Sequence, residues 1–229
     1  METNTFARPS SHHAVLTFIF FTLLTNIPSI TSATITCSTS TISTNSTQTI
    51  KENTASIPSN NYSSARTFIT YIKTSCYSTT YPSICYQNLS PYASKIQADP
   101  IKLCNISLSL ALKATHTASS TISKILKSNN LTHIAKEVIH DCLYNVETSI
   151  GQLRDSLVAM VHLDGIDRKF QISNIKTWMS SSITNDQTCS DELDEMNVNA
   201  TVRDKTRKSI LKATRVNSNA LSFINHLIY

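Results

Sequence analysis

Few residues of this chain are arranged in a way that would support catalysis. His140-Asp141-Cys142 brings a base, an acid and a thiol together along the sequence. These neighbours would not form a catalytic pair, because adjacent residues of a helix point to different sides. The sequence contains no metalloprotease motif, paired Cys-x-x-Cys motif, nucleophile elbow or glycine-rich phosphate loop. We therefore predict no enzymatic activity, no catalytic residue and no cofactor.

Candidate metal ligands are equally sparse. Asp191, Glu192, Asp194 and Glu195 form a local acidic cluster that could bind calcium weakly, but a solvated acidic turn is the simpler interpretation. Histidines are spread along the chain, at His116, His133, His162 and His226. We expect no metal site, and by elimination the chain is predicted to be a binding protein.

A polar tetrapeptide, Thr188-Cys189-Ser190-Asp191, follows a stretch with the pattern of an amphipathic helix. Between Phe170 and Asp191, apolar residues recur every three or four positions, which predicts a helix with one buried face. These residues are Ile172, Ile175, Met179 and Ile183. A disulfide at Cys189 would tether the end of this helix. We expect a docked helix whose end is pinned and exposed to solvent.

The composition favours an all-helical protein. Only two glycines occur in 229 residues, which nearly excludes glycine-dependent hairpins and nucleotide-binding turns. Hydrophobic residues make up 40% of the chain, enough for one core. The formal net charge of +5 would suit an acidic partner. Because the lysines and arginines are scattered along the sequence, we expect no nucleic-acid binding.

The first 65 residues are expected to lie outside the folded domain. Residues 1–33 are predicted to be a secretory signal peptide, since Arg8 precedes an apolar run and small residues follow at a candidate cleavage site. The apolar run is too short for a comfortable transmembrane helix, so we expect no membrane attachment after its removal. Residues 34–65 are rich in Ser, Thr and Asn and are predicted to be a flexible linker.

A secretory signal makes the Asn-x-Ser/Thr sequons candidate glycosylation sites. Several of them are expected to carry glycans. The sequons are at Asn45, Asn61, Asn88, Asn105, Asn130 and Asn199.

The folded domain is expected to span residues 66–229 and to begin with a helical hairpin. A short helix opens with Phe68, and the Tyr81-Pro82 step breaks the helical pattern. Cys76 and Cys85 flank this proline turn, and a hairpin can bring two such cysteines within disulfide distance. We predict a hairpin closed by a Cys76–Cys85 disulfide.

Four long helices are predicted after the hairpin. Asp99-Pro100 is a strong start signal, with Asp as the N-cap and Pro in the first turn, for a helix that runs to about Leu126. The others cover about 132–161, 170–191 and about 201–227. Their expected buried positions are Leu108, Ala111, Thr115, Ala118, Ile122 and Ile125, then Ile139, Leu143, Val146, Ile150, Leu153, Leu157 and Met160, and finally Ile210, Ala213, Asn217, Ala220 and Ile224. This pattern predicts an all-α, up-down-up-down four-helix bundle preceded by the hairpin.

Several ordered segments resemble the plant pectin methylesterase inhibitor and invertase inhibitor family. They are FITYIKTSCYSTTYPSICYQNLSPYAS, the helix entry ADPIKL, HDCLYNVETSIGQL, FQISNIKTWMSSSITNDQTCSD and the closing SNALSFIN. Each segment alone is weakly specific, but together they are highly specific. The resemblance runs from about Phe68 to Ile224 and covers essentially the whole predicted domain.

The resemblance implies a disulfide-stapled helical hairpin and bundle. In the family, the first cysteine pairs with the second and the third with the fourth, which implies Cys76–Cys85 and Cys142–Cys189 here. The second pairing would tie the helix of about residues 132–161, which contains Cys142, to the end of helix 170–191. Cys37 and Cys104 lie outside this framework, and three states remain open for them: free thiols, a bond to each other, or a link between two chains.

The resemblance also implies a secreted inhibitor of the apoplast or cell wall that forms a one-to-one complex with its target. Family inhibitors of pectin methylesterase cover the pectin-binding cleft with their bundle helices. Matching by position makes Thr188 and Asp191 contact residues at the end of helix 170–191, with Glu147 on the preceding helix. A hydroxyl and a carboxylate suit such a contact, because both hydrogen-bond to the polar groups that line a carbohydrate cleft.

One departure from the family pattern concerns the helix around Cys142. Members often carry several acids after this cysteine, but here only Glu147 remains, and Tyr144, Thr148, Gly151 and Gln152 stand at the other positions. Charge complementarity mainly sets association rate and specificity. The resemblance therefore implies weaker or narrower inhibition than that of a typical member.

Two alternatives to pectin methylesterase inhibition stay open from the sequence. The first is inhibition of an acid invertase, although the Pro-Lys-Phe motif of invertase inhibitors is absent and Arg168-Lys169-Phe170 is the nearest match. The second is a non-inhibitory wall protein that binds acidic pectin through its positive charge. Adsorption through scattered charges should collapse at moderate ionic strength. We expect the protein to be a monomer.

Overall fold

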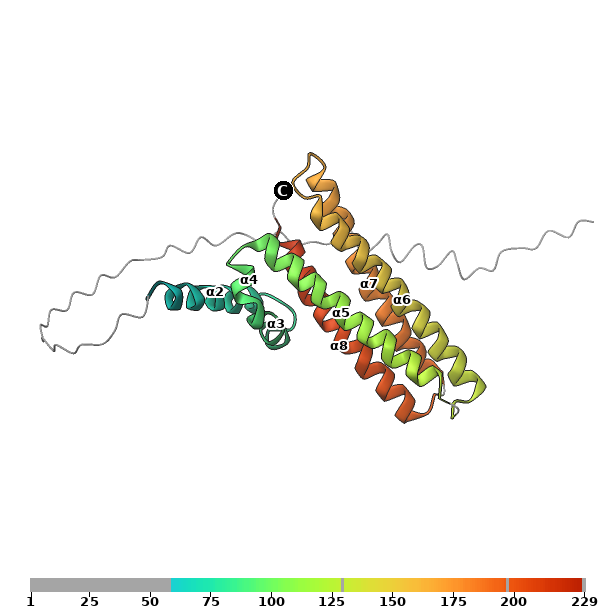
Figure 1. The fold of residues 1–229 in the computed structure, drawn as a ribbon. Coiled ribbons are helices and arrows are strands. Elements are labelled where there is room, and N and C mark those ends of the chain that lie inside the picture. Colours follow the sequence, from blue (N-terminus) through green and yellow to red (C-terminus); the bar gives the residue numbers. More distant parts are fainter. Residues whose placement is uncertain (1–58, 129, 197, 228–229) are drawn as a thin grey trace, which may run out of the picture. The chain divides into compact units, whose positions relative to one another are not determined.

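The computed structural model describes residues 59–128, 130–196 and 198–227, and all of its regular elements are helices. In chain order they are α2 (Ser59–Tyr77), α3 (Pro82–Leu89), a short 3-10 helix η1 (Ser90–Tyr92), α4 (Ala93–Ile96), α5 (Pro100–Leu126), α6 (His133–Val161), α7 (Arg168–Glu195) and α8 (Ala200–Asn225) (Figure 1). The predicted signal peptide, Cys37 and Asn45 lie outside the described residues. None of the described helices combines the length and the apolar character needed to cross a membrane.

Helix α2 begins at Ser59, within the range expected to be a linker. The predicted start near Arg66 followed the first apolar residues, Phe68 and Ile69. Once the first turn of a helix has formed, each further residue adds a hydrogen bond at little cost, so a helix can extend past its apolar part. At the end of this added part, Ser64 and Ala65 are exposed.

Local capping chemistry sets the starts of three long helices. At α5, the Oδ1 atom of Asp99 accepts hydrogen bonds from the backbone N–H groups of Ile101 (2.8 Å) and Lys102 (3.0 Å), and Pro100 fills the first turn as predicted. The Thr132 hydroxyl accepts from the Ala135 N–H at α6, at 3.2 Å. The Asn199 side chain accepts from the Thr201 N–H at α8, at 2.9 Å.

The four long helices α5–α8 form an antiparallel bundle, as predicted (Figure 1). Each helix packs against the next one in the chain for α5–α6, α6–α7 and α7–α8, and α5 also packs along α8 to close the bundle. The most extensive contacts are between α6 and α7 and between α5 and α8. These two pairs therefore form opposite sides of the bundle.

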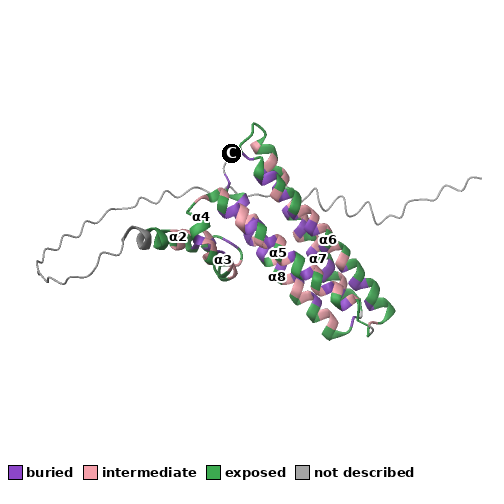
Figure 2. Ribbon diagram, in the orientation of Figure 1, coloured by how far each residue is buried: buried purple, intermediate pink, exposed green. Residues whose placement is uncertain are grey.

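The buried stripes agree with most of the predicted positions (Figure 2). All the positions predicted on α5 and α8 are buried, and on α6 only Leu143 and Leu157 are half-buried. The stripe on α7 differs, because Ile183 is only half-buried and the buried line continues through Ser182 and Asp186. The reason is the helical repeat: Ile172, Met179, Asp186 and Leu193 stand seven residues apart and share one face.

Polar residues from every long helix divide the apolar core into two clusters. One cluster includes Leu108, Leu153 and Met179, and the other includes Ile122, Val146 and Leu193. Between them lies a layer that we call the polar layer, and each member is at most 1% exposed: Thr115, Ser149, Ser182, Asp186 and Asn217. Hydrogen bonds between members of this layer join α6 to α7 and α7 to α8, whereas Thr115 bonds to the Ala111 carbonyl within α5, so the layer favours one alignment of α6, α7 and α8.

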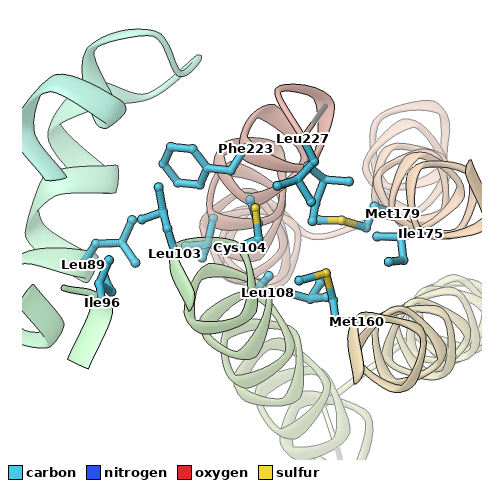
Figure 3. Packing of buried hydrophobic residues seen from close by; sticks show 14 of the residues in the cluster. Leu89, Ile96, Leu103, Cys104, Leu108, Met160, Ile175, Met179, Phe223 and Leu227 are labelled. Atoms are coloured by element: carbon cyan, nitrogen blue, oxygen red, sulfur yellow. The ribbon is translucent and has the colours of Figure 1, made fainter. Parts of the chain in front are cut away.

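The N-terminal hairpin is joined to the bundle through buried apolar and amide groups. Leu89 and Ile96 belong to the same core cluster as Leu103 and Phe223 (Figure 3). The Asn219 side chain of α8 makes two hydrogen bonds to the backbone of Tyr81, one accepted from its N–H (2.9 Å) and one donated to its carbonyl (3.0 Å). This amide therefore docks the turn between α2 and α3 onto α8.

Candidate functional site

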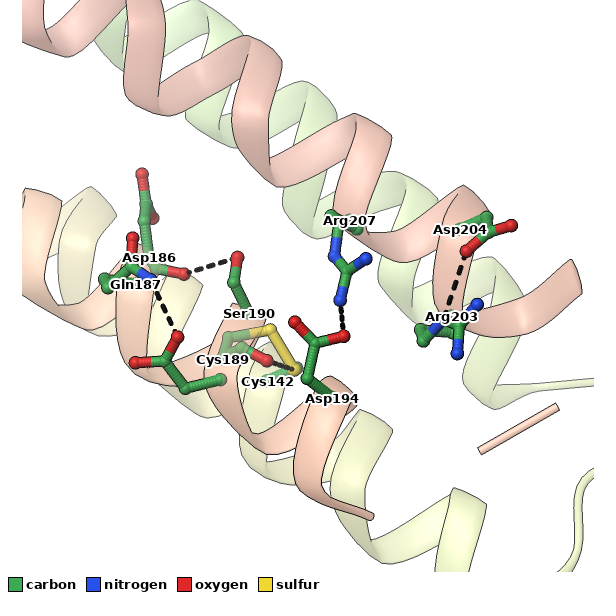
Figure 4. Close-up of polar contacts among 10 residues, drawn as sticks. Cys142, Asp186, Gln187, Cys189, Ser190, Asp194, Arg203, Asp204 and Arg207 are labelled. Atoms are coloured by element: carbon green, nitrogen blue, oxygen red, sulfur yellow. Dashed lines mark hydrogen bonds and ion pairs between the residues drawn. A yellow bond between two sulfur atoms is a disulfide. The ribbon is translucent and has the colours of Figure 1, made fainter. Parts of the chain in front are cut away.

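Two disulfides join pairs of helices, and one of these pairs carries the candidate site. Cys76–Cys85 joins α2 to α3 with a Cα–Cα distance of 5.5 Å, and Cys142–Cys189 joins α6 to α7 with a Cα–Cα distance of 4.6 Å. Both pairings agree with the expectation from the sequence. The second bond lies in the core and fixes the α7 segment that contains Thr188 and Asp191 against α6 (Figure 4).

Thr188 and Asp191 are both exposed and lie on one face of α7, three residues apart. The Thr188 hydroxyl donates to the Thr184 carbonyl at 3.1 Å, which leaves its oxygen lone pairs available to a partner. The Gln187 amide donates to Asp191 Oδ1 at 2.7 Å and orients that carboxylate. Helix α7 continues to Glu195, so the two residues lie on the side of the helix, about one turn before its end, rather than at its tip.

A chain of side-chain amides and hydroxyls continues from these residues along the junction of α6 and α7. The Asn185 amide donates to Gln152 Oε1 at 3.1 Å, and the Gln152 amide donates to Ser181 Oγ at 2.7 Å. Exposed Thr184 donates to the Ser180 carbonyl at 3.2 Å. We call Gln152, Ser181, Thr184, Asn185, Thr188 and Asp191 the α6–α7 polar face. Its groups are held in place by bonds within the protein, so little ordering is needed when a partner binds.

Acidic side chains border one end of the α6–α7 polar face. Glu192 of α7 is half-buried, and its pKa is raised by burial and then by the negative charges of Asp141 on α6 and Glu195 on α7. Helix α7 thus places carboxylates beside Asp141, although the positions after Cys142 on α6 have few acids. The acidic character that the α6 sequence lacks is partly restored across the helix junction.

Glu147 does not lie with Thr188 and Asp191. It is exposed and stands one heptad before Arg154, which extends to His116 of α5, with 3.4 Å between Arg154 Nη2 and His116 Nε2. Residues seven apart share a helix face, so Glu147 lies on the side of α6 toward α5. The α7 side of α6 is occupied instead by Ser149 and Gln152.

The residues that superficially suggested catalysis or metal binding have other roles. His140 Nδ1 is 3.7 Å from Asp141 Oδ1 at an exposed position, while Cys142 is buried in its disulfide. Asp194 pairs with Arg207 of α8 (Figure 4), whereas Asp191 accepts a hydrogen bond from the Gln187 amide of its own helix. Within the described ranges, no three His, Cys, Asp or Glu side chains are grouped so that they could hold a metal ion.

Cys104 is a free thiol, 1% exposed, in the core of the bundle. Burial, and secondarily the charge of Asp99, raises the pKa of this thiol to about 12. Of the three states left open by the sequence, the structure shows the free thiol. The bond partner considered for it, Cys37, lies outside the described residues.

The sequons differ in their accessibility. Asn130 is exposed in the turn between α5 and α6, and Asn199 is exposed as the N-cap of α8. Asn88 on α3 and Asn105 on α5 are half-buried. Asn88 lines a hollow between α5 and α8, together with Lys113 and Lys212. A glycan at Asn88 would therefore lie on the side of the bundle opposite the α6–α7 polar face.

The family resemblance predicted Thr188 and Asp191 as contact residues, but the amides Gln152 and Asn185 were not predicted. In the sequence, Gln152 stood out only as a position where family members often carry an acid. A signal was present, because Ser181, Asn185 and Thr188 recur every three or four residues in the polar part of helix 170–191. Their connection to Gln152 depends on how α6 lies against α7, which the periodicity of one helix does not specify.

Comparisons with known proteins place these features in a family. A family model described as "Plant invertase/pectin methylesterase inhibitor" matches residues 70–223. Pectinesterase inhibitor 10 of Arabidopsis thaliana is 38% identical over 165 residues, which cover 71% of this chain and 52% of that protein. Pectinesterase inhibitor 4 of the same plant is 34% identical over 162 residues, covering 69% and 81% respectively. The chain thus spans about half the length of one of these relatives and most of the other.

Two further similarities concern an enzyme and a solved structure. Pectinesterase 1 of Citrus sinensis is 31% identical over 162 residues, but the match covers only 27% of that protein against 68% of this chain. The crystal structure of mutant form A of a pectin methylesterase inhibitor from Arabidopsis aligns with a TM-score of 0.56 at 16% identity, covering 69% of this chain and 97% of that one. This last similarity shows that the two chains share a fold.

Proposed function

The chain belongs to the plant invertase/pectin methylesterase inhibitor family, a family of inhibitors rather than enzymes, and we propose that it inhibits a pectin methylesterase. It would form a one-to-one complex in which the α6–α7 polar face covers the pectin-binding cleft of the enzyme. The observation that carries this proposal is the pair Thr188 and Asp191, exposed side by side and oriented by bonds to Thr184 and Gln187. The names of the relatives support the choice of target.

The chemistry of the α6–α7 polar face suits a cleft that binds a carbohydrate. Such a cleft is lined by donors and acceptors for sugar hydroxyls, and hydroxyl, amide and carboxylate groups can take the place of those sugar groups. The disulfide between Cys142 and Cys189 holds the two helices together below this face. Rigid elements present binding groups with a smaller loss of conformational entropy than flexible loops.

Secretion into the apoplast or cell wall forms part of the proposal. Two disulfides are expected to form and persist in an oxidising compartment rather than in the cytosol. Residues 1–33 would serve as the signal peptide, and the exposed sequons at Asn130 and Asn199 could carry glycans. The mature inhibitor would act as a monomer.

The first test is an inhibition assay on the secreted, disulfide-bonded protein at mildly acidic pH. Increasing amounts of the protein are added to a plant pectin methylesterase and, in parallel, to a plant acid invertase. We expect inhibition of the esterase with one-to-one stoichiometry. Inhibition of the invertase alone, or of neither enzyme by protein whose helical content is intact, would contradict the proposal.

The contact site is tested by the double variant Thr188→Ala/Asp191→Ala. Loss of two hydrogen-bonding groups at the centre of an interface should raise the inhibition constant by about tenfold or more. Thermal stability should stay close to that of the parent protein, because both side chains are exposed.

The matched control is Thr70→Ala/Asp164→Ala. Thr70 makes the same kind of hydroxyl-to-carbonyl bond on α2, at 2.9 Å to Arg66, and Asp164 is exposed in the turn before α7. This variant should inhibit like the parent. If both double variants inhibit equally well, the α6–α7 polar face is not the contact site.

A further inference from the structure

Positive charge is concentrated on α8. Between Ala200 and Asn225 this helix has six basic residues and one acid, Asp204, so its net charge is +5. That value equals the formal net charge of the whole chain. The sequence suggested scattered basic residues, and the fold corrects this view, because residues three and four apart on a helix share one face.

An open groove of about 430 Å³ runs along the basic side of α8. Its cationic lining consists of Arg207, Lys208, Lys212 and Arg215, and Asp204 also lines it. Ile84 of α3 and Leu211 of α8, both half-buried, supply the apolar part of the lining. We call this feature the α8 basic groove.

The cations of the α8 basic groove are not neutralised equally. Arg207 pairs with Asp194 of α7, and Arg215 lies over the Tyr81 ring with 5.7 Å from its guanidinium carbon to the ring centre. In the part of the chain that the structure describes, no carboxylate pairs with Lys208 or Lys212, and both lysines are exposed. Like charges four residues apart on a helix repel each other, so this arrangement does not help α8 to fold.

We propose that the α8 basic groove binds a linear polyuronate, the chemical class of de-esterified pectin. Lys208, Lys212 and Arg215 of the groove follow one another at steps of four and three residues, which places successive cations about 4.5–6 Å apart along α8. Successive uronate units of an extended chain carry one carboxylate per sugar ring, at a comparable spacing. The C–H faces of the sugar rings would contact Ile84 and Leu211.

The lining favours a polyuronate over a nucleic acid. Single-stranded nucleic acids are held by stacking of bases on free aromatic rings. The aromatic ring beside this groove is Tyr81, and the guanidinium of Arg215 already lies over it. Aliphatic side chains between cations match a polymer with apolar ring faces and charged edges.

The α8 basic groove is lined by residues of α8 and α3, whereas the α6–α7 polar face consists of residues of α6 and α7, so the two surfaces share no residue. Both could be occupied at the same time. Binding to de-esterified pectin would then hold the protein on the polymer that a pectin methylesterase produces. Polymer binding by α8 does not depend on whether the protein inhibits the enzyme.

The experiment measures binding of the secreted full chain to calcium-free polygalacturonate by isothermal titration calorimetry, with fully methyl-esterified pectin and single-stranded DNA as comparison polymers. The test variant is Lys208→Gln/Lys212→Gln. The control variant, Lys73→Gln/Lys136→Gln, makes the same change in net charge at exposed lysines of α2 and α6. Each polymer is tested at about 50 mM and about 200 mM salt.

We expect polygalacturonate to bind more tightly than either comparison polymer, with lower affinity at the higher salt concentration. The test variant should lose about tenfold or more in affinity, since two close cation contacts are removed, and the control should lose less than about twofold. Equal losses in both variants would show non-specific attraction by net charge. Equal binding of the esterified polymer, or tighter binding of DNA, would also overturn the proposal.

Discussion

Asp186 is a carboxylate buried in the polar layer, with 1% of its surface exposed. Its Oδ2 atom accepts a hydrogen bond from the Thr214 hydroxyl of α8 at 2.8 Å, and its Oδ1 atom lies 3.4 Å from the Ser149 hydroxyl of α6. Burial raises the pKa of Asp186 from 3.8 to about 6, and these two hydrogen bonds oppose that rise. The protein therefore holds this carboxyl partly protonated at mildly acidic pH.

The raised pKa predicts the pH dependence of stability. A carboxyl that binds its proton more tightly in the folded state stabilises the fold below its unfolded pKa, and this contribution is lost as the pH rises through its folded pKa. Relative to Asp186→Asn, the parent protein should lose about 2 kcal/mol of unfolding free energy as the pH rises from about 4 to about 7. Urea denaturation at several pH values measures this difference.

The variant Thr214→Val tests the same prediction by changing the pKa of Asp186 without replacing Asp186 itself. It removes a hydroxyl that lowers the pKa of Asp186 and keeps the shape of the side chain. The loss of stability in this variant should extend to higher pH than in the parent protein. Parallel pH profiles for the parent and Asp186→Asn would show that Asp186 does not titrate in this range.

At the scale of the element, α6 contains an internal glycine whose Cα faces open space. A Cβ atom added at Gly151 would meet no heavy atom within 4 Å. Glycine in a helix loses more backbone entropy on folding than alanine does. No neighbouring group in the described structure packs so closely against Gly151 that a side chain would be excluded.

Gly151→Ala should therefore stabilise the protein by about 0.5–1 kcal/mol. The midpoint of guanidinium denaturation measures the change, and the slope of the transition should stay the same. Gly165→Ala is the control, because Gly165 lies in the turn before α7 rather than inside a helix, and a Cβ there would make only an ordinary contact, 3.5 Å from the His162 carbonyl oxygen. A loss of stability in Gly151→Ala would contradict the prediction.

The apolar repeat of helix α7 predicts part of its buried face correctly and part of it incorrectly. The apolar residues Ile172, Ile175 and Met179 correctly predict its buried face, and all three are 0% exposed. Extending the stripe to Ile183 selected the wrong residue, because an apolar type was given more weight than the seven-residue step from Met179 to Asp186. The helix accommodates a buried acid there since α6 and α8 supply hydroxyl groups to it.

At the scale of the whole molecule, the two disulfides close loops of very different length. Cys76 and Cys85 are separated by 9 positions, and Cys142 and Cys189 by 47. A disulfide that closes a longer loop removes more conformational entropy from the unfolded chain. The bond between α6 and α7 should therefore contribute more to global stability than the bond in the hairpin.

Loop-closure entropy predicts losses of about 4 kcal/mol for Cys142→Ala/Cys189→Ala and about 3 kcal/mol for Cys76→Ala/Cys85→Ala. Chemical denaturation of the two double variants measures both losses. Inhibition of the esterase should also suffer more from the first variant, because that disulfide lies beneath the α6–α7 polar face. A larger loss of stability from opening the hairpin would contradict this ranking.

The sequence by itself determined the helical class, the four long helices, the Asp99 cap and the Cys76–Cys85 bond. These properties depend on local signals: the 3.6-residue repeat, the Asp99-Pro100 start and the proline turn between Cys76 and Cys85. The family signatures added Thr188 and Asp191 as candidate contacts. The family resemblance also implied the Cys142–Cys189 bond, which the structure contains, whereas Thr188 and Asp191 stay predicted contacts.

Only the tertiary structure decided which residues of different helices meet. It buried Asp186 between Ser149 and Thr214, joined Gln152 to Asn185, directed Glu147 toward α5, and aligned the cations of α8 beside Ile84. The physical reason is that periodicity specifies the buried face of a helix, whereas the order and rotation of the packed helices specify its neighbours. The candidate binding surfaces of this protein lie between helices, where that second kind of information is required.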